Sequence, residues 1–550
     1  MTSWQTHEVT NQFDELADYN LFTTDVPLRE ALQHAQATEF ADSLESYGQK
    51  LGTAESFGLA EQANRLRPQL RSFDRRGHRI DRVEFHPAWH RFMALLREQG
   101  LVSLPFQSEQ QGRWSAWAAG FHLHGQVEAG SLCPATMTQA SIPVLRHEPA
   151  LWGQLHGRLF SRAYDTRDRP MTEKASIWVG MGMTEKQGGS DVRANATTAA
   201  PAGKPGRGAE YRLRGHKWFF SAPDCDAHLV VARDAYGHSC FFVPRWRPDG
   251  TRNAVQVQRL KDKLGNASNA SSEIELLDAY GILMGEEGRG IPTIIEMAAY
   301  TRLNCVVGSA ALLRQALVQA LSYARRRKAF GQVLAAQPLM RAVLADLALE
   351  SEAAVVLMMR LARAYEHEAD PVERAWKRLM TPAAKFWVCK RAVELIGETM
   401  EVLGGNGYVE DGIMARLFRE APVNSIWEGS GNVMCLDVLR AASREAGTLQ
   451  LVLEDLAREA GDEPRLAAEL QDLEAQFRAD PHTLEARARH LVARLVLAAQ
   501  ACLMRARVPD AVAGAFLASR GEAGWGPVVG AVDARRLPVE ALLARALPPA

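Results

Sequence analysis

Residues 183–191 read MTEKQGGSD and follow a short apolar run, Ile177–Gly180. Thr184 and Ser190 place hydroxyls on either side of a glycine pair. Backbone N–H groups at such a turn can point toward an anion or toward the polar edge of a ring. A tight turn without a ligand explains the same residues equally well, so the flanking sequence has to decide between the two interpretations.

Residues 175–285, around this turn, break into short runs rich in Val, Ile, Phe and Tyr. Several runs alternate polar with apolar residues, as half-buried strands do. The Pro, Gly and Ala residues of 199–208 form an exposed connection between two of these runs. Strands at this spacing predict a small antiparallel β-barrel or sandwich in the middle of the chain.

Helical spacing of apolar residues brackets the β segment on both sides. Residues 28–52 and 87–99 have this spacing, whereas 65–83 is loop-like. Residues 386–403 form a seam with steps of three and four, which suits a helix bundle and stops at a glycine pair. A last helical segment has breaks near 461–464 and 480–481. We expect an α+β chain of four parts: an N-terminal helical domain (1–174), a β domain (175–285), a C-terminal helical bundle (286–442) and an additional helical domain (443–550).

The bulk composition is that of an ordinary folded protein. The 550 residues are 47% hydrophobic, and 64 Lys and Arg nearly balance 65 Asp and Glu, which leaves a net charge of −1. Any attraction to nucleic acid or to a membrane must therefore come from a local patch. Seven cysteines form no CxxC and no spaced Cys/His set, and the first residues lack the apolar core of a secretory signal. We expect no metal site, no membrane span and a cytoplasmic location.

Two further segments carry residue types suited to a cofactor. Residues 215–221 read GHKWFFS, an aromatic run that fits a strand core as well as a cofactor wall, and its Ser221 offers a hydroxyl to a ring nitrogen. Residues 325–328 read RRRK at the end of a predicted helix. These cations can complete the helix dipole, or a planar guanidinium among them can bind a pyrophosphate.

One carboxylate, Glu428, lies in the glycine-rich stretch 425–432, SIWEGSGN. A lone glutamate in a loop is usually solvated surface. Here Ile426 and Trp427 would desolvate the carboxylate, which favours a working base. A second glycine-rich turn, GGNGY at 404–408, lies in the same half of the chain.

Together, and in this order, these segments resemble the acyl-CoA dehydrogenase family over about residues 85–440. The sequence departs from the family's pattern at Lys186 and Gln187 in the flavin turn, and Phe219 stands where tryptophan is usual. The resemblance implies bound FAD, with an arginine motif that reaches the FAD of a neighbouring subunit. The residues that it assigns to the cofactor are Met181, Gly182, Met183, Thr184, Glu185, Lys186, Gln187, Gly188, Gly189, Ser190, Phe219, Phe220, Ser221, Arg327, Phe330, Gln337, Gly404, Gly405, Trp427, Gly429, Ser430, Gly431 and Asn432.

The resemblance also implies the reaction, which removes two hydrogens across the bond α,β to a thioester. Glu428 is at the position of the family's base and is the expected catalytic residue. Arg302 is at the position of an arginine that meets the CoA end of the substrate, but Ala299 replaces the aspartate usual three residues before it. Binding energy remote from the reacting bond helps to position that bond, so we expect slow dehydrogenation or a different substrate.

The long extensions at both ends, together with the stretches 216–221, 260–269 and 422–440, resemble a subfamily associated with the response to DNA alkylation. This resemblance implies a homotetramer, weak isovaleryl-CoA dehydrogenase activity and binding of double-stranded DNA through the C-terminal domain. From Arg444 onward, 13 Arg, no Lys and 15 Asp and Glu give a net charge of −2, so this domain is not basic as a whole. Residues 486–509 nevertheless contain no acid. A helix there aligns three arginines, which a fourth at the junction extends: Arg487, Arg494 and Arg505, with Arg440.

That alignment is either a solvated bundle edge or a cationic stripe that follows phosphates without reading bases. Three functions stay open. The first is a flavoprotein that combines FAD, DNA and residual dehydrogenase chemistry. The second is an ordinary short- or branched-chain acyl-CoA dehydrogenase whose extension aids assembly. The third is a DNA-shielding protein in which FAD is structural and Glu428 is idle.

Overall fold

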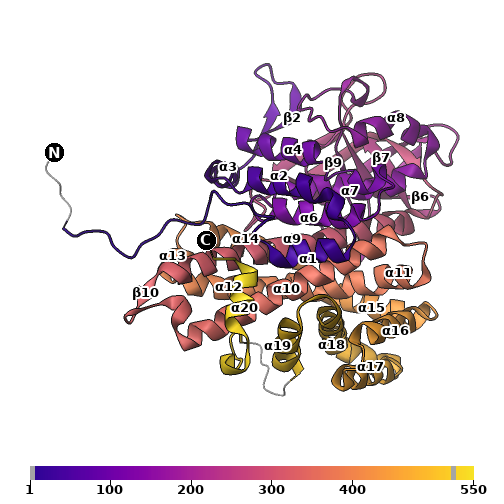
Figure 1. The fold of residues 1–550 in the computed structure, drawn as a ribbon. Helices are drawn as coiled ribbons and strands as arrows, with labels where there is room; N and C mark the ends of the chain where they lie inside the picture. The colour runs from indigo at the N-terminus through magenta and orange to yellow at the C-terminus, as the bar shows by residue number, and fades with distance from the viewer. Residues whose placement is uncertain (1–5, 522–527, 550) are drawn as a thin grey trace.

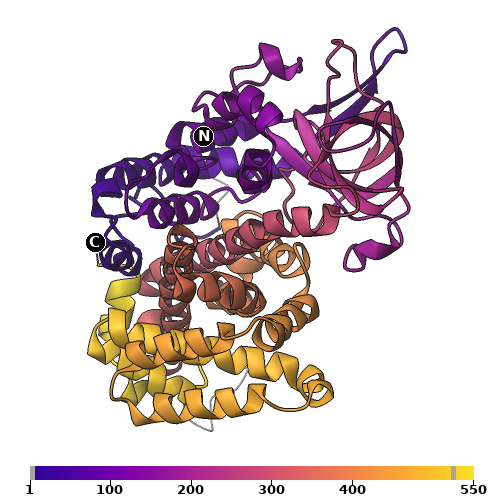
Figure 2. The same ribbon diagram turned by 90° about the vertical axis from the view of Figure 1, so that its right-hand side faces the viewer.

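The computed structural model describes residues 6–521 and 528–549. A β domain and the N-terminal helices lie side by side, a helix bundle lies beneath them, and the C-terminal helices cover the opposite face of the bundle (Figures 1 and 2). The helical, β, helical order expected from the sequence is confirmed.

The N-terminal domain is mostly helical. The helices expected in 28–52 and 87–99 are present, and the second has the predicted ends. The loop expected over 65–83 is wrong, because this segment forms an antiparallel hairpin. Its strands carry charge on both faces, so the alternation that marks a half-buried strand is hidden. The elements are α1 (Val26–His34), a 3-10 turn (Thr38–Phe40), α2 (Ala41–Leu51), α3 (Ala54–Arg65), β1 (Gln69–Phe73), β2 (Arg79–Glu84), α4 (Pro87–Gln99), α5 (Leu104–Gln107), α6 (Arg113–Gly125), α7 (Leu132–Arg146) and α8 (Pro149–Phe160).

The β domain is one mixed sheet whose pairings close on themselves. The strand order is β3-β6-β4-β5-β9-β7, with β8 on β9, and β7 pairs back to β6. Most pairs are antiparallel as expected, but β3 and β4 each pair with β6 in parallel. Tyr211, Leu213, Phe241 and Leu276 fill the interior. The strands are β3 (Val179–Gly182), β4 (Thr198–Pro201), β5 (Glu210–Ser221), β6 (Ala227–Asp234), β7 (Gly237–Pro244), β8 (Val255–Leu260) and β9 (Ser271–Met284).

The bundle is built around α9, a helix of 37 residues. By length and composition α9 could cross a membrane, yet its apolar window is entirely buried, as in the core helix of a globular protein. The predicted seam of 386–403 lies in α12, which ends at Gly404 with φ +61°. The elements are α9 (Gly290–Arg326), β10 (Lys328–Ala329), β11 (Gln332–Val333), α10 (Pro338–Glu366), α11 (Pro371–Ala375), a π-helical turn (Trp376–Met380), α12 (Thr381–Leu403), α13 (Gly405–Tyr408), α14 (Ile413–Ile426) and α15 (Gly431–Arg444).

The C-terminal helices are packed onto the bundle rather than tethered to it. The breaks expected near 461–464 and 480–481 separate α16, α17 and α18. Helix α18 packs against α10, α12 and α15 as well as against its own neighbours, and α20 packs on α10. The elements are α16 (Thr448–Ala460), α17 (Pro464–Phe477), α18 (Pro481–Arg507), α19 (Asp510–Gly521) and α20 (Val539–Ala546).

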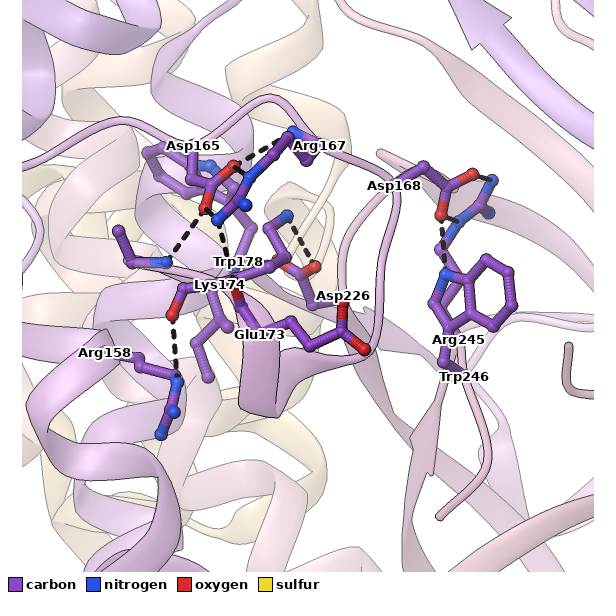
Figure 3. Close-up of polar contacts among 12 residues, drawn as sticks. Arg158, Asp165, Arg167, Asp168, Glu173, Lys174, Trp178, Asp226, Arg245 and Trp246 are labelled. Atoms are coloured by element: carbon purple, nitrogen blue, oxygen red, sulfur yellow. Dashed lines mark hydrogen bonds and ion pairs between the residues drawn. The ribbon is translucent and has the colours of Figure 1, made fainter. Parts of the chain in front are cut away.

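The segment that leads from α8 into β3 is held by ion pairs (Figure 3). Lys174 Nζ donates to Asp226 Oδ1 at 2.7 Å, and both side chains are buried. Asp168 accepts hydrogen bonds from the indole of Trp246 at 2.7 Å and from the guanidinium of Arg245. These contacts fix the N-terminal helices to the β domain.

A second buried pair fastens the glycine turn to β5. Lys217 Nζ donates to Glu185 Oε1 at 2.7 Å and to Val231 O at 2.7 Å, and the side chains of Lys217 and Glu185 are fully buried. The Glu185 carboxylate also accepts the backbone N–H of Ala196 at 2.7 Å. Burial raises the pKa of this carboxyl, but the Lys217 ammonium outweighs burial and lowers the pKa to about 2.

Replacing Lys217 by methionine should lower the free energy of unfolding by about 3–5 kcal/mol, because a buried carboxylate would lose its charged partner. Urea unfolding followed by tryptophan fluorescence measures the change. Arg214→Met is the matched control in the same strand, since Arg214 pairs with Asp278 on the exposed surface, and this change should cost less than about 1 kcal/mol. Equal losses in the two variants would contradict a buried ion pair at Lys217.

Candidate active site

Glu428 lies in a loop with a left-handed backbone, at φ +58°. A non-glycine residue in this conformation needs support from its surroundings. Thr301 and Arg302, consecutive residues of α9, provide it: Thr301 Oγ1 donates to Glu428 Oε2 at 2.6 Å, and Arg302 Nε donates to Glu428 O at 3.1 Å. Lys385 of α12 donates to Gly429 O at 2.8 Å. The core helices therefore set the position of this carboxylate.

Arg302, the candidate substrate residue, has protein partners on both sides of its guanidinium. Besides its contact with the Glu428 loop, its Nη1 donates to Asp437 Oδ2 at 2.6 Å. Asp437 belongs to α15 and also accepts from Arg378 at 3.1 Å. Ala299 O, one turn before Arg302, accepts a hydrogen bond from Tyr365 Oη at 2.6 Å. Arg302 thus ties α9 to the loop and to α15.

Ser221 ends β5 and faces polar groups of the β domain. Its hydroxyl lies 3.2 Å from that of Ser271, the first residue of β9. Lys263 Nζ donates to Ser271 Oγ at 3.0 Å and to Asn269 O at 2.7 Å. Asn269 Oδ1 is buried and has no hydrogen-bond partner in the described part of the chain. This group combines hydroxyls, an ammonium and an unsatisfied acceptor.

Cys133, at the start of α7, is a buried thiol that lies within electrostatic reach of both Lys263 and Glu428. Burial raises the pKa of its thiol to about 12, a shift that the Lys263 ammonium opposes and the Glu428 carboxylate increases. Burial also lowers the pKa of Lys263, to about 8. Sequence reasoning missed Cys133, Lys263 and Thr301. Only Lys263 had a signal, since it lies in 260–269, one of the stretches that resemble the alkylation-response subfamily.

Of the predicted cofactor residues of 181–190, Met181 and Gly182 are the last residues of β3, and residues 183–190 form the turn that follows it. Trp218 N donates to Thr184 O at 2.8 Å, and Asn195 Nδ2 donates to Met183 O at 2.7 Å, so the turn is attached to the rest of the β domain. Glu185 points into the interior through its pair with Lys217. A Cβ at Gly182 would lie 2.7 Å from Phe220, so glycine allows the close approach of β3 to β5.

The aromatic run of β5 divides between the core and the surface. Phe220 is buried and stacks on His228, with ring centroids 3.8 Å apart. Phe219 is 51% exposed. Phe220 is therefore a residue of the strand core, whereas the exposed part of Phe219 can contact a ligand.

A second group of predicted cofactor residues lies at the far end of α9. Arg327 donates to Asn11 O, Gln337 Nε2 donates to Ala329 O at 2.9 Å, and Phe330 is 97% exposed with φ +52°. The glycine pair at 404–405 has open space beside both Cα atoms. Arg327 is about 39 Å along the helix from Thr301, at ~1.5 Å per residue. One chain therefore does not bring this group to Glu428.

The remaining candidates of the loop after α14 pack against helices. Trp427 Nε1 donates to Asn424 Oδ1 at 3.1 Å. Asn432 Oδ1 accepts from Arg489 of α18 at 3.2 Å, and a Cβ at Gly431 would lie 2.5 Å from the Lys390 side chain. Ser430 precedes α15 as its N-cap residue.

The four arginines proposed for DNA already have partners in the protein. Arg494 makes two hydrogen bonds to Glu469 and one to Asp472, all at 2.8 Å. The other three contact Gln476, Asp510 and Asp437, at 2.6, 3.0 and 3.5 Å for Arg487, Arg505 and Arg440 respectively. The alignment exists on α18, but acidic side chains of α17 and Asp510, the first residue of α19, neutralise much of it.

The residues around Ser221 suit a flavin. The polar edge of an isoalloxazine carries several acceptors and one N–H donor. The Lys263 ammonium and the Ser221 and Ser271 hydroxyls supply donors, and the unsatisfied Asn269 Oδ1 supplies an acceptor. Across residues 6–521 and 528–549, no group of three or more His, Cys, Asp or Glu could hold a metal ion.

Comparison with known proteins agrees with this arrangement. The model of the N-terminal domain of the adaptive response protein AidB matches residues 11–166, and the middle and C-terminal domain models of acyl-CoA dehydrogenase match 180–279 and 288–443. The chain is 49% identical to the putative acyl-CoA dehydrogenase AidB of Escherichia coli K12, over 86% of this chain and 87% of that protein. It is 32% identical to acyl-CoA dehydrogenase family member 11 of Caenorhabditis elegans, over 77% of this chain and 70% of that protein.

A solved structure extends the comparison to three dimensions. The crystal structure of Caenorhabditis elegans ACDH-11 in complex with C11-CoA superposes with a TM-score of 0.83 at 26% identity, over 98% of this chain and 93% of that one. Members of the acyl-CoA dehydrogenase family bind FAD, as the residues around Ser221 led us to expect. The chain belongs to the acyl-CoA dehydrogenase family of FAD-dependent oxidoreductases and, within it, to the AidB subfamily.

Proposed function

We propose that this chain oxidises an acyl-CoA thioester between its α and β carbons, with Glu428 as the base that takes the α proton. The support is the hydrogen bond from Thr301 to Glu428 Oε2, which orients the carboxylate, together with the buried Cys133 thiol, whose pKa both Glu428 and the Lys263 ammonium influence. Within the described residues Oε1 accepts no hydrogen bond, so it is available to a proton. Bound FAD supplies the acceptor for the β hydride.

The proposed substrate is a short branched acyl-CoA such as isovaleryl-CoA, oxidised slowly. Arg302 already donates hydrogen bonds to Asp437 and to the backbone carbonyl of Glu428, and Ala299 offers no polar side chain to CoA. Less binding energy is therefore available away from the reacting bond to hold it in place. The ACDH-11 structure contains C11-CoA, and a long straight acyl chain is the competing substrate class.

We also propose that FAD sites are completed between copies of the chain, in a homotetramer. The group of Arg327 and Phe330 lies about 39 Å along α9 from Thr301, too far to join the same flavin ring. Phe330 is almost fully exposed at the tip of the β10–β11 hairpin. A second copy can bury this side chain and bring Arg327 to its own cofactor.

A third proposal is association with double-stranded DNA in the response to alkylation, in the cytoplasm. Its support is the AidB domain of the adaptive response, which matches residues 11–166. The seven cysteines are free and buried, which suits a reducing compartment. The two alternatives are an ordinary dehydrogenase whose C-terminal helices aid assembly, and a DNA-shielding protein with structural FAD.

Glu428→Gln should abolish bleaching of the flavin by isovaleryl-CoA while FAD stays bound, because the amide cannot accept the α proton at a useful rate. Anaerobic mixing with the visible spectrum as readout tests this. Glu420→Gln is the control, a buried glutamate of α14 that contacts Asn266 instead of the Glu428 loop. Bleaching that survives in Glu428→Gln would assign the chemistry to another carboxylate.

Thr301→Val should slow bleaching by about tenfold or more, because a hydrogen bond to a charged carboxylate contributes about 1.5–3 kcal/mol and here holds Glu428 in position. Valine keeps the volume of threonine and removes only the donor. Thr301→Ser restores a hydroxyl and should recover the wild-type rate. An unchanged rate in Thr301→Val would show that Thr301 only packs.

Arg327→Ala should lower both the FAD content of the purified protein and the apparent oligomer size, because both depend on the same contact between copies. The ratio of flavin to protein absorbance and analytical ultracentrifugation measure the two effects. Lys328→Ala, a cation at the next position, is the matched control and should change neither. A normal oligomer without FAD would separate the two roles and contradict a shared site.

A further inference from the structure

An extended segment before α1 lies along the far end of α9. Leu16 exchanges two hydrogen bonds with the side-chain amide of Gln319, through its backbone N and O, both at 2.9 Å. Nearer the N-terminus, Asp14 O accepts a hydrogen bond from Arg326 Nη2 at 2.9 Å. The segment therefore runs antiparallel to α9, since its residue numbers fall as those of the helix rise. We call residues 11–16 the N-terminal strap.

Asn11 joins the N-terminal strap to the β10–β11 hairpin. Its side-chain amide pairs with both backbone groups of Lys328: Nδ2 donates to Lys328 O, and Oδ1 accepts from Lys328 N, each at 2.8 Å. Asn11 has a left-handed backbone, at φ +59°, which asparagine adopts more readily than most residues. Asn11 O accepts a hydrogen bond from Arg327 Nη1. The amide pair therefore fixes the carbonyl that holds Arg327.

The next residue of the N-terminal strap reaches the second glycine-rich turn, at 404–408. Gln12 Oε1 accepts a hydrogen bond from Asn406 Nδ2 at 2.8 Å. Glu15 Oε1 accepts the backbone N–H of Ile413, the first residue of α14, at 2.5 Å. In Figure 1 the indigo chain passes α13 and then extends away from the body of the molecule. The strap thus connects the end of α9, the hairpin and this turn.

Burial of apolar surface does not explain the first residues of the N-terminal strap. Gln12 and Phe13 are exposed, and Asn11 is only half-buried. Hydrogen bonds between exposed groups add little to stability, because water replaces them when the chain unfolds. The contacts of Asn11 and Gln12 therefore fix the geometry of their partners more than they stabilise the fold.

Arg327 keeps most of its hydrogen-bonding capacity under this restraint. A guanidinium carries several N–H donors, and within the described residues the Arg327 side chain uses a single one, toward Asn11 O. Across residues 6–521 and 528–549 it forms no ion pair with a carboxylate. A planar guanidinium with donors to spare suits the oxygens of a phosphate.

We propose that the N-terminal strap belongs to the cofactor site shared between copies, with Asn11 and Gln12 as positioning residues. Asn11 holds the Arg327 guanidinium and Gln12 holds the turn at 404–408 before a second copy brings its dinucleotide to them. A side chain that is already restrained loses less conformational freedom on binding. This inference rests on the shared FAD site proposed above and extends that site to a segment outside every motif that pointed to FAD.

The test is a double-mutant cycle on FAD affinity. The full-length holoprotein is diluted in steps, and the fluorescence of released FAD gives the dissociation constant. Asn11→Ala should raise this constant about tenfold, the effect of losing one hydrogen bond to a charged group. In an Arg327→Lys background the same change should raise it less than about twofold, because Asn11 does not hold a flexible ammonium.

A second variant and a control separate positioning from folding. Gln12→Ala should raise the dissociation constant about threefold through the turn at 404–408. Tyr19→Phe is the matched control, since Tyr19 Oη donates to Gln315 of α9 at 2.9 Å, away from the hairpin, and this change should leave the constant unaltered. At saturating FAD, the sedimentation coefficient and the urea unfolding midpoint of each variant should match the wild type.

The inference is overturned if Asn11→Ala keeps the wild-type dissociation constant. It is also overturned if Asn11→Ala costs as much in the Arg327→Lys background as alone, since the strap would then act on the fold rather than through Arg327. Should Asn11→Ala fail to fold, Gln12→Ala decides, and a wild-type constant in that variant overturns the inference. An Arg327→Lys protein with wild-type FAD affinity would refute the shared site itself, and this inference with it.

Discussion

Burial of α9 on all sides over residues 303–324 is the constraint on which the rest of the structure depends. This helix packs against α6 and α7 of the N-terminal domain, β7 of the β domain, and α10, α12 and α14 of the bundle. A helix so apolar has to be covered completely, and three parts of the chain share that cover. Groups attached to α9 are therefore fixed relative to all three. The carboxylate of Glu428 and the distant Arg327 both owe their positions to this one element.

The sequence predicted those elements whose local pattern agrees with their final environment. The α12 seam of Phe386, Cys389 and Ile396 packs into the bundle, and its glycine stop has the positive φ that only glycine adopts freely. The β1–β2 hairpin was not predicted. Its apolar residues are Leu70, Phe73, Ile80 and Val83, and their spacing of three within each strand, with charges between them, conceals the strand period of two. Where surface charge serves something other than the core, periodicity carries little information.

The site was predicted in part, for a related reason. Motif spacing located Glu428, Ser221 and the glycine turn, because each is a local pattern. It could not foresee Cys133 or Lys263, because the packing of α7 brings the Cys133 thiol within electrostatic reach of both Lys263 and Glu428. It also gave no hint that Glu185, inside the glycine turn, would be buried against Lys217.

The small net charge conceals two different arrangements of the charged residues. The chain is nearly neutral, at −1. The positive charge on α18 is nevertheless matched by acids, whereas the β1–β2 hairpin places Arg71 directly opposite Arg82. Exposed ion pairs contribute only about 0–1 kcal/mol each, so matched charge on α18 is weakly held. The facing Arg71 and Arg82 destabilise the strand pair of the hairpin, and stability alone gives no reason for this arrangement.

Strain at Glu428 is the clearest sign that the loop serves chemistry. A left-handed glutamate costs roughly 1–3 kcal/mol, and it persists only where its surroundings fix it. Thr301 holds the side chain, Arg302 holds the carbonyl, and Lys385 holds Gly429, which itself has φ +102°. The core helices therefore stabilise a conformation that the loop would not adopt alone, and a carboxylate fixed in this way can act as a base without reorganising first.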